Sequence, residues 1–281
     1  KRARPTLFAT VPRLWMKFQL GVFSKMPAAQ LDAMLDNPDM APVVGKQVLA
    51  GLGLDAAVYG ASGAAPLPVE VIDWYRKLGL PMYEAYGMTE NFAMASIGNK
   101  DFHAVGCVGV PYPGVDIKIS EDGEVLVKSP GQMVGYFKQP ELTAACLTSD
   151  GYFKTGDLGE LTATGELKIT GRVKDLFKTS KGKYIAPAPI ESVFNASALV
   201  EMSAVSGANF EAPFVAVVLA EHLRPTWADD AKRTELIAQL LTLLDSVNAQ
   251  LPAFQQLKFL VVCTDPWSIE TACLTPTLKL K

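Results

Sequence analysis

Histidine, cysteine and long apolar runs are scarce in this sequence, and neither charge predominates. Two histidines and four cysteines occur in 281 residues. The cysteines include no C-x-x-C pair, which disfavours a zinc site and a disulfide scaffold alike and fits a reducing cytoplasm. They are Cys107, Cys146, Cys263 and Cys273.

The charges are nearly balanced. Lys and Arg number 26 and Asp and Glu 29, so the net charge of -3 provides no overall field that would attract nucleic acid or anionic lipid. No stretch approaches the ~18 consecutive apolar residues that a membrane span needs, and residues 1–5 lead into no signal-peptide core. We therefore expect a cytoplasmic protein with no nucleic-acid partner and no transmembrane segment. Peripheral contact with the inner face of a membrane and the oligomeric state stay open.

The length corresponds to about two domains, and 49% hydrophobic residues are enough to fill two cores. The chain has no initiating Met and ends on Leu-Lys-Leu-Lys281, so we expect it to continue at both ends.

Apolar spacing predicts a helical start followed by a strand, a loop and another helix. Residues 1–55 are patterned mostly as helices, and the short apolar run at 56–59 predicts a strand. The loop 60–66 then leads to a helix that begins near Pro68 and that Gly79 caps.

Two β-hairpins are the clearest local signals. Alternation of apolar and polar residues at 115–119 and 125–127 flanks an Asp-Gly turn. A second hairpin joins 158–161 to 167–169 through a turn at Thr164-Gly165.

The residue pattern changes after Arg172, where a basic loop begins, and we place a domain boundary near 171–175. The later part predicts a helix near 189–196, strands at 204–205, 214–219 and 259–262, and one long helix. That helix carries an apolar stripe of Leu236, Leu240, Leu244, Val247 and Leu251.

Two nucleotide-binding motifs can be set aside. The G-x-G-x-x-A run at 51–56 leads into the expected strand instead of opening a helix, as a dinucleotide fingerprint must. Neither Lys46 nor Lys183 is followed by the Ser or Thr of a P-loop.

Ser62 raises a hydrolase alternative. It follows the expected strand within Gly-Ala-Ser-Gly-Ala, and Asp157 and His222 come later in the order of an α/β-hydrolase triad. Ala64 replaces the last glycine of the nucleophile elbow, however, and two prolines delay the helix that should follow.

Three polar, glycine-containing segments follow expected strands and carry more functional groups than turns require. They are Tyr83–Glu90, Tyr152–Leu158 and the basic run from Gly171 to Lys183. Singly, each segment also has an ordinary structural explanation: Thr-Glu could be a helix cap, Gly-Asp a hairpin end, and the lysine run a solvated face.

In this order, with Ser62–Pro66 ahead and Thr275–Lys279 behind, the segments closely resemble the motifs of the adenylate-forming (AMP-binding) superfamily, in its long-chain fatty acyl-CoA synthetase-like branch. The resemblance covers essentially the whole chain and is strongest over 171–191. It implies an α/β (α+β) fold. Residues 1–171 would be the C-terminal portion of the large mixed-sheet AMP-binding domain, and 172–281 the small mobile C-terminal domain, cut short at its end.

The resemblance also implies an activity. Such enzymes activate a carboxylic acid, here a long-chain fatty acid, with ATP to an acyl-adenylate and release pyrophosphate. They then transfer the acyl group to the thiol of coenzyme A, and the small domain rotates between the two steps.

The resemblance assigns the nucleotide site to four segments. The adenine-facing loop would be Gly63, Ala64 and Ala65, whose small side chains let the backbone approach a flat base. Tyr86 would stack near the base, and Gly87 beside it belongs to the same site.

The phosphates, the metal and the ribose are assigned to polar side chains. Thr89 would hydrogen-bond the α-phosphate, and Glu90 would hold Mg²⁺, which prefers carboxylate oxygen. Asp157 would accept both ribose hydroxyls, and Arg172 would donate to the same ribose.

The remaining assignments concern the small domain. Lys174 would be its hinge, and the segment Thr179 to Lys183, with Ser180 and Gly182, would approach the pantetheine arm of coenzyme A. Lys279 would stabilise the charge that develops during adenylation, with Lys281 a less favoured candidate.

One family motif is missing. The Ser/Thr/Gly-rich loop that cradles the β- and γ-phosphates is not present in these residues, so we expect it upstream of Lys1. The isolated chain is then expected to release no pyrophosphate from ATP and fatty acid.

Three other hypotheses remain besides the acid–thiol ligase. A fatty acyl-AMP ligase would deliver to a carrier protein, whose acidic surface Lys178, Lys181 and Lys183 could contact as readily as the phosphates of coenzyme A. The Ser62 esterase would hydrolyse activated esters without ATP. A non-catalytic module would bind ATP and release no pyrophosphate.

Overall fold

The computed structural model describes residues 3–275 and 280, and the chain divides into two compact units. The units are Lys1–Val173 and Lys174–Lys281. Helices and several separate sheets occur together, so the fold is α+β, as the sequence predicts. No helix in the described part of the chain combines the length and apolarity that a membrane crossing needs.

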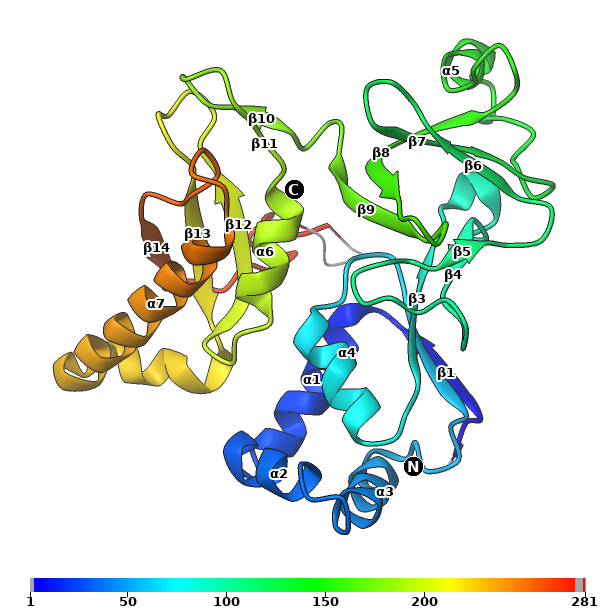
Figure 1. Cartoon of the computed structure of the whole chain (residues 1–281). Helices are drawn as coiled ribbons and strands as arrows, with labels where there is room; N and C mark the ends of the chain where they lie inside the picture. The colour runs from blue at the N-terminus through cyan, green and yellow to red at the C-terminus, as the bar shows by residue number, and fades with distance from the viewer. Residues whose placement is uncertain (1–2, 276–279, 281) are drawn as a thin grey trace. The chain divides into compact units, whose positions relative to one another are not determined.

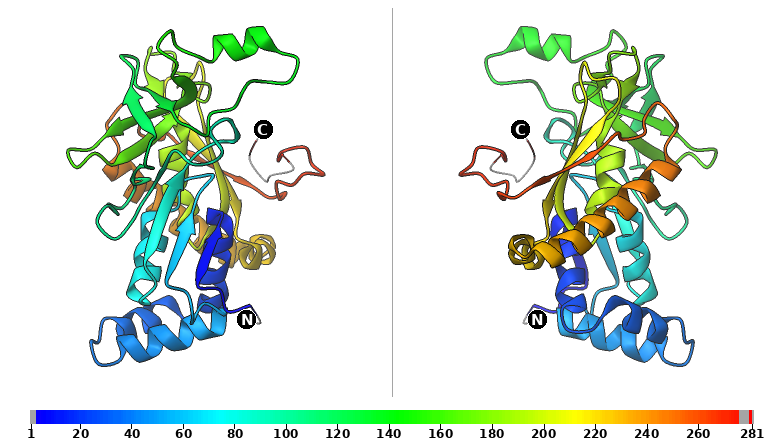
Figure 2. Two further views of the ribbon diagram at one scale, coloured as in Figure 1. Left: turned by 90° about the vertical axis from the view of Figure 1, so that its right-hand side faces the viewer. Right: turned by 90° about the vertical axis from the view of Figure 1, so that its left-hand side faces the viewer.

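A five-stranded sheet and four helices form the first half of unit 1. The strands pair in chain order, the first three in parallel and the last two antiparallel: β1 (Leu7–Thr10), β2 (Tyr59–Ser62), β3 (Met82–Tyr86), β4 (Ser96–Ile97) and β5 (Val110–Pro111). The helices are α1 (Pro12–Phe23), α2 (Ala28–Leu35), α3 (Ala41–Leu52) and α4 (Val69–Lys77). The first three strands stand side by side in Figure 2, with α2 and α3 below them.

Two buried aromatic side chains join the sheet to its helices. Trp15 of α1 donates from Nε1 to the carbonyl oxygen of Ala61 at 3.2 Å, and the Tyr75 hydroxyl of α4 donates to the carbonyl oxygen of Trp15 at 2.8 Å. Both side chains are fully buried and pack edge to face. Each therefore fills the core and satisfies its one polar group there.

The strand expected at 56–59 lies three residues later, at Tyr59–Ser62, and β1 was not expected at all. Val58 is 67% exposed, whereas Gly60, Ala61 and Ser62 are buried between β1 and β3. Parallel pairing between residues about fifty positions apart decides where this strand lies, and local apolarity does not carry that information.

The helix expected from Pro68 is α4, and it ends as predicted. Gly79 has a φ of +88°, its N–H donates to the carbonyl oxygen of Arg76, and Leu80 N–H donates to that of Tyr75. This pair of bonds is the Schellman cap, which satisfies the last carbonyl groups of the helix.

The second half of unit 1 is a four-stranded antiparallel sheet. Its strands are β6 (Asp116–Ile119), β7 (Glu124–Lys128), β8 (Phe153–Leu161) and β9 (Leu167–Arg172). Both expected hairpins are present, β6–β7 and β8–β9. Leu167 exchanges backbone hydrogen bonds with Val108 and Gly109 (2.7 and 2.8 Å), next to β5. The short helix α5 (Pro140–Ala145) projects from this sheet (Figures 1 and 2).

Unit 2 contains a β-hairpin, β10 (Phe177–Lys178) and β11 (Tyr184–Ile185), and a three-stranded sheet. The sheet consists of β12 (Val200–Ser206), β13 (Phe214–Leu219) and β14 (Leu260–Cys263). The helices α6 (Pro187–Asn195) and α7 (Asp230–Gln250) pack against one face of it (Figure 1). Four residues of the expected apolar stripe are buried there, Leu236, Leu240, Leu244 and Val247.

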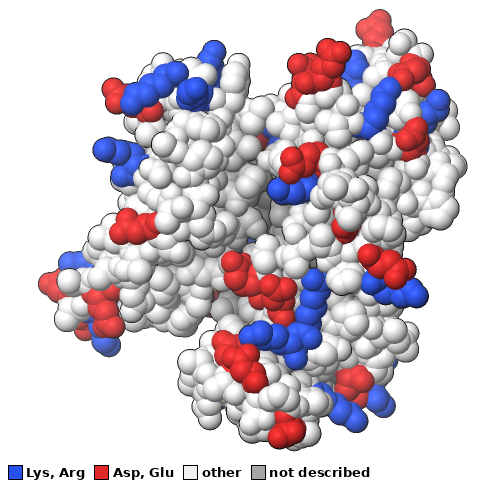
Figure 3. Space-filling model, in the orientation of Figure 1, with Lys and Arg blue, Asp and Glu red and all other residues white. Residues whose placement is uncertain are grey.

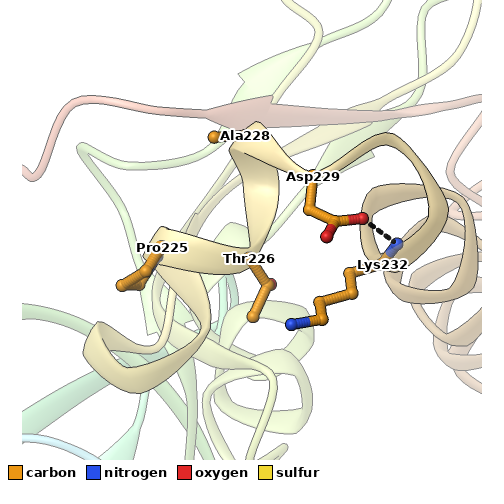
Figure 4. A pocket seen from close by; sticks show the side chains of 5 residues that line it. All are labelled: Pro225, Thr226, Ala228, Asp229 and Lys232. Atoms are coloured by element: carbon orange, nitrogen blue, oxygen red, sulfur yellow. Dashed lines mark hydrogen bonds between the residues drawn. The ribbon is translucent and has the colours of Figure 1, made fainter.

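Asp229 caps the N-terminus of α7. Its Oδ1 accepts hydrogen bonds from the backbone N–H groups of Ala231 and Lys232 at 3.0 and 3.1 Å. A shallow pocket of about 460 Å³ lies beside this cap, at the end of the 3₁₀ helix Glu221–Ala228 (Figure 4). None of the residues assigned to the candidate site lines it.

Candidate active site

Asp157, Tyr86 and Arg172 form one hydrogen-bonded group. The Tyr86 hydroxyl donates to Oδ2 of Asp157 at 2.6 Å, and Nε of Arg172 donates to Oδ1 at 2.8 Å. Asp157 is 8% exposed, whereas the Arg172 side chain is 55% exposed. The structure thus brings together three side chains that the motif assignments placed at the base and the ribose.

The Tyr86 phenol remains a donor at physiological pH. Burial raises its pKa above the ordinary value, and the nearby Asp157 carboxylate raises the pKa further. A protonated hydroxyl directed at a carboxylate makes a charge-assisted hydrogen bond, which is stronger than a bond between neutral groups.

A β-bulge positions Asp157 within β8, not at a strand end as the sequence suggested. The pairing between β7 and β8 shifts register between Glu124 and Leu126, and Gly156 lies opposite this shift with a φ of +73°. Gly156 N–H donates to the Glu124 carboxylate at 2.8 Å, and the carbonyl oxygen of Gly156 accepts from Val173 at 2.8 Å. Asp157 stays paired with Arg172 of β9, so this register shift lies on the β7 side. Bulges re-aim side chains, and the carboxylate next to this one meets Tyr86.

The turn after β3 carries Thr89 and Glu90 in a short 3₁₀ helix, Thr89–Asn91. Asn91 is 1% exposed, and its Oδ1 accepts from Met88 N–H at 2.9 Å. Thr89 is exposed. A Cβ on Gly87 would lie 2.3 to 2.6 Å from the backbone of Ala93, so only glycine allows the turn to close on itself.

Glu90 is held from both its backbone and its side chain. The Tyr136 hydroxyl donates to Oε1 of Glu90 at 2.9 Å, and Met133 N–H donates to the Glu90 carbonyl oxygen at 2.8 Å. Burial, followed by the Glu90 carboxylate, raises the pKa of Tyr136 to about 12. The sequence reasoning assigned no role to Tyr136, whose only local signal was a Gly-Tyr pair after the second strand of a hairpin.

Among residues 3–275 and 280, no three His, Cys, Asp or Glu side chains are grouped so that they could hold a metal ion. A lone carboxylate nevertheless fits Mg²⁺, because this ion usually takes one or two carboxylates together with substrate phosphates. Oε2 of Glu90 makes no hydrogen bond within the described part of the protein and is therefore available for such a role.

The residues assigned to adenine, Gly63, Ala64 and Ala65, lie in the loop 63–66 at the carboxyl end of β2. Ala64 and Ala65 are exposed, and Ala64 has a φ of 70°. Ligands of open α/β sheets bind outside the carboxyl ends of the strands, so the loop lies where such a site is expected.

Glu84 of β3 is a buried carboxyl group to which the sequence reasoning gave no role. It is 8% exposed, and its Oε1 accepts from the backbone N–H of Leu67 at 3.1 Å. Burial raises the pKa of Glu84 to about 7, although the Leu67 N–H and the field of Arg76 act in the opposite direction. A charged residue within a short, largely apolar strand was the sequence signal that could have identified it.

Ser62 does not have the surroundings of a hydrolase nucleophile. It is 2% exposed, and its Oγ has no hydrogen-bond partner among the described residues. Both oxygens of Asp157 accept from Tyr86 and Arg172 instead of from a histidine. A serine nucleophile needs a hydrogen-bonded base that is itself oriented, and neither condition is met.

In unit 2, Lys174 is exposed and is the first residue of the unit. Ser180 N–H donates to the carbonyl oxygen of Phe210 at 2.9 Å, and Gly182 N–H donates to that of Thr179 at 2.9 Å. Lys178 lies over the Tyr184 ring, and Lys183 over the Phe254 ring, at 5.3 and 5.8 Å from the ring centroids. Lys279 and Lys281 lie outside the described residues.

The surface charges are mixed. On the face shown in Figure 3, basic and acidic side chains occur in small interspersed groups, and the described residues of neither unit present a broad area of one sign there. This face therefore offers no broad field of one sign to a charged ligand.

Solved structures with the same fold are adenylate-forming enzymes. The AMP complex of the A-PCP didomain of carboxylic acid reductase from Segniliparus rugosus superposes with a TM-score of 0.74 at 23% identity, over 99% of this chain and 39% of that one. ATP-bound MatB from Rhodopseudomonas palustris gives a TM-score of 0.65 at 28% identity, over 94% of this chain and 48% of that one. The fold is therefore that of the adenylate-forming class.

Sequence comparison narrows the class to a family. The family model for AMP-binding enzymes matches residues 1–137, and the model for the AMP-binding enzyme C-terminal domain matches residues 174–272. The chain belongs to the AMP-binding enzyme family, as its motifs predict.

Relatives within the family include long-chain acyl-CoA synthetases. Long chain acyl-CoA synthetase 7, peroxisomal, from Arabidopsis thaliana is 30% identical over an alignment of length 327. The alignment covers 99% of this chain and 46% of the relative. Long-chain-fatty-acid-CoA ligase 5 from Rattus norvegicus is 29% identical over an alignment of length 323. The alignment covers 100% of this chain and 47% of the relative. The chain thus spans about half the length of the curated relatives it matches.

Proposed function

We propose that the protein takes part in ATP-dependent activation of a long-chain fatty acid and its transfer to coenzyme A. In the first step a carboxylate oxygen attacks the α-phosphorus of ATP, and pyrophosphate leaves. In the second step the thiol of coenzyme A attacks the acyl carbonyl, loses its proton, and AMP leaves. The observation that carries the proposal is the buried Asp157 carboxylate held between Tyr86 and Arg172.

That group suits a ribose with two free hydroxyls. Each carboxylate oxygen of Asp157 already accepts one protein hydrogen bond and retains a further lone pair that can accept from a ribose hydroxyl. Arg172, more than half exposed, has guanidinium N–H groups besides Nε with which to donate to the same sugar. The Tyr86 ring would lie against the base, and the loop of Gly63, Ala64 and Ala65 would face it.

The phosphate end of the nucleotide is assigned to the turn after β3. Thr89, which is exposed, would donate to the α-phosphate, and Glu90 would hold Mg²⁺ through the oxygen that Tyr136 does not occupy. When bound, the ion would offset the negative charge of the phosphates. Glu90 is fixed by Tyr136 and Met133, so little side-chain freedom is lost on binding.

The thioester half-reaction is assigned to unit 2. The β10–β11 turn, with Ser180 and Gly182 and the flanking lysines, would meet the pantetheine arm and phosphates of coenzyme A. Lys174 would be the hinge, and Lys279 would act in adenylation only. The division into residues 1–171, as part of a large domain, and 172–281, as a small mobile domain, stays a prediction. The cytoplasmic location is likewise a prediction.

The reaction is tested by three measurements on a purified protein that also contains the upstream phosphate loop, because the 281-residue chain alone is expected to release no pyrophosphate. We expect pyrophosphate release that depends on both ATP and a long-chain fatty acid, trapping of the acyl group by hydroxylamine, and formation of acyl-CoA that is detected by mass spectrometry. Asp157→Ala should abolish most of the pyrophosphate release. Asp150→Ala, which removes an exposed carboxylate bound to Lys118 in the same unit, is the matched control and should not.

The outcomes separate the competing functions. Transfer to a carrier protein but not to coenzyme A would make the protein an acyl-AMP ligase. Ester hydrolysis without ATP that Ser62→Ala abolishes would overturn the proposal entirely. ATP binding without pyrophosphate release, in a protein that contains the upstream phosphate loop, would indicate a non-catalytic module.

A further inference from the structure

The loop 63–66 is strained at Ala64, and together with Leu67, which joins it to α4, it makes few hydrogen bonds. Ala64 occupies the left-handed region at a φ of 70°, which is unfavourable for a residue with a Cβ. A Cβ on Gly63 would lie 3.2 Å from the carbonyl oxygen of Ala85, so the loop already runs close to β3. Outside the sheet ladders, the described residues supply one hydrogen bond to residues 63–67, from Leu67 N–H to Glu84 Oε1.

Glu84 is well placed to hold the loop. Its backbone is fixed in the middle of the sheet, where it pairs with Ser62 of β2 and its carbonyl oxygen accepts from Gly98 N–H at 2.8 Å. The buried Ser62 hydroxyl beside it has no partner among the described residues and so does not hold the loop in its place. The acceptor is therefore rigid, and the donor lies at the junction between the loop and α4.

We infer that Glu84 is a positioning residue, whose carboxyl group holds Leu67 and thereby keeps the loop 63–66 in the conformation that the nucleotide site requires. The consequence for nucleotide binding rests on the proposed function, which places this loop against the adenine. The hold on Leu67 itself does not depend on that function.

The hold on Leu67 changes with pH. The charged or titratable groups that act on Glu84 are Arg76 of α4 and, after β4, the Cys107 thiol, whose own pKa is raised by burial, by Glu166 and by Glu84. With the loop closed, the pKa of Glu84 is about 7, whereas a carboxyl group that water reaches when the loop opens titrates near its ordinary value. The closed state binds the proton more tightly, so closure is favoured at low pH and weakens as the pH rises towards and through 7.

Two prolines make the experiment specific. Pro66 and Pro68 have no N–H, so Leu67 carries the one backbone amide of the segment 66–68. Hydrogen exchange of that amide, corrected for the intrinsic effect of pH, measures loop opening directly. In the wild-type protein we expect opening to increase roughly tenfold or more between pH 5 and pH 7.

Two substitutions of Glu84 separate its hydrogen bond from its titration. Glu84→Met removes the acceptor at similar volume and should speed Leu67 exchange by about tenfold or more, the loss expected for a hydrogen bond to an ionisable group. Glu84→Gln keeps a carbonyl acceptor and should retain protection but lose its pH dependence. Glu166→Gln is the matched control, since Glu166 is a buried carboxylate that accepts from Ala104 N–H at 2.8 Å, and it should leave Leu67 unchanged.

AMP binding is measured on the same variants by calorimetry. Weaker AMP binding in Glu84→Met, restored in Glu84→Gln, supports the positioning role. Unchanged exchange at Leu67 in a folded Glu84→Met protein, or wild-type exchange without the expected pH dependence, overturns it. If the wild-type protein binds no AMP, the proposed function fails, and the exchange data alone decide whether Glu84 holds the loop.

Discussion

At the scale of single residues, the Asp157 carboxylate both organises its own surroundings and is assigned to the ribose. It accepts from a partly buried phenol of β3 and from an exposed guanidinium at the end of β9. A preorganised acceptor loses little freedom when a ligand binds, which favours affinity. The same bonds mean that removing Asp157 also leaves Tyr86 and Arg172 without their partner.

We predict that Asp157→Ala lowers affinity for ATP at least about tenfold, since hydrogen bonds to a charged group contribute about 1.5 to 3 kcal/mol each. Calorimetric titration with ATP and with 2′,3′-dideoxy-ATP tests the assignment. The variant should lose affinity for ATP and bind the dideoxy nucleotide as the wild type does. An equal loss for both nucleotides would show that Asp157 acts through the fold and not through the ribose.

At the scale of elements, the motif turn after β3 is tightly packed. The turn after β3 closes so sharply that Gly87 touches the backbone of Ala93, and Phe92 and Ala93 both have positive φ. Tyr136 and Met133 then attach this turn to the segment after β7. The backbone of the turn therefore positions Thr89 and Glu90, and Tyr136 also holds the Glu90 side chain.

We expect Gly87→Ala to reduce the free energy of unfolding by about 1 to 3 kcal/mol, the usual cost of overpacking, because its Cβ would meet backbone atoms that cannot rotate away. Urea denaturation measures the change. Gly21→Ala is the control, because Gly21 is exposed in α1 with open space around it. That substitution should be neutral or stabilising, since alanine is the better helix former. A Gly87→Ala protein as stable as the Gly21→Ala protein would contradict the close approach.

At the scale of the whole molecule, the chain consists of two units with separate cores that meet in sequence between Val173 and Lys174. The Val173 N–H is tied to Gly156 of unit 1, whereas Lys174 N–H donates no hydrogen bond among the described residues. A proline at 174 would therefore remove no backbone bond, and its effect would come from fixing φ near -65°.

We predict that Lys174→Pro slows thioester formation while acyl-adenylate formation continues, because the proposed rotation needs backbone freedom at this position. Lys279→Ala should do the reverse and slow adenylation by about a hundredfold to a thousandfold, as the loss of a preorganised charge donor does. Each half-reaction is measured separately, the second with supplied acyl-adenylate. Lys174→Ala removes the charge but leaves the backbone free to rotate, so this variant should resemble the wild type. Equal losses in both steps would argue against domain alternation.

The sequence alone determined the features that depend on neighbours along the chain. The Asp-Gly turn between β6 and β7, the Gly79 cap of α4 and the buried stripe of α7 each follow from a few adjacent residues, and all are present. The ordered motifs also identified the family, because five short motifs rarely occur together in the same order by chance.

Tertiary structure decided the features that depend on contacts between distant residues. Parallel pairing placed β2 at Tyr59–Ser62 and added β1, since neither strand is specified by its own apolarity. The meeting of Tyr86 with Asp157, which are 71 positions apart, and the burial of Glu84 beneath Leu67 exist only once the sheets have formed. The hydrogen-bond partners and the pKa of a side chain are set by its neighbours in space, and for these residues the neighbours come from other strands and loops.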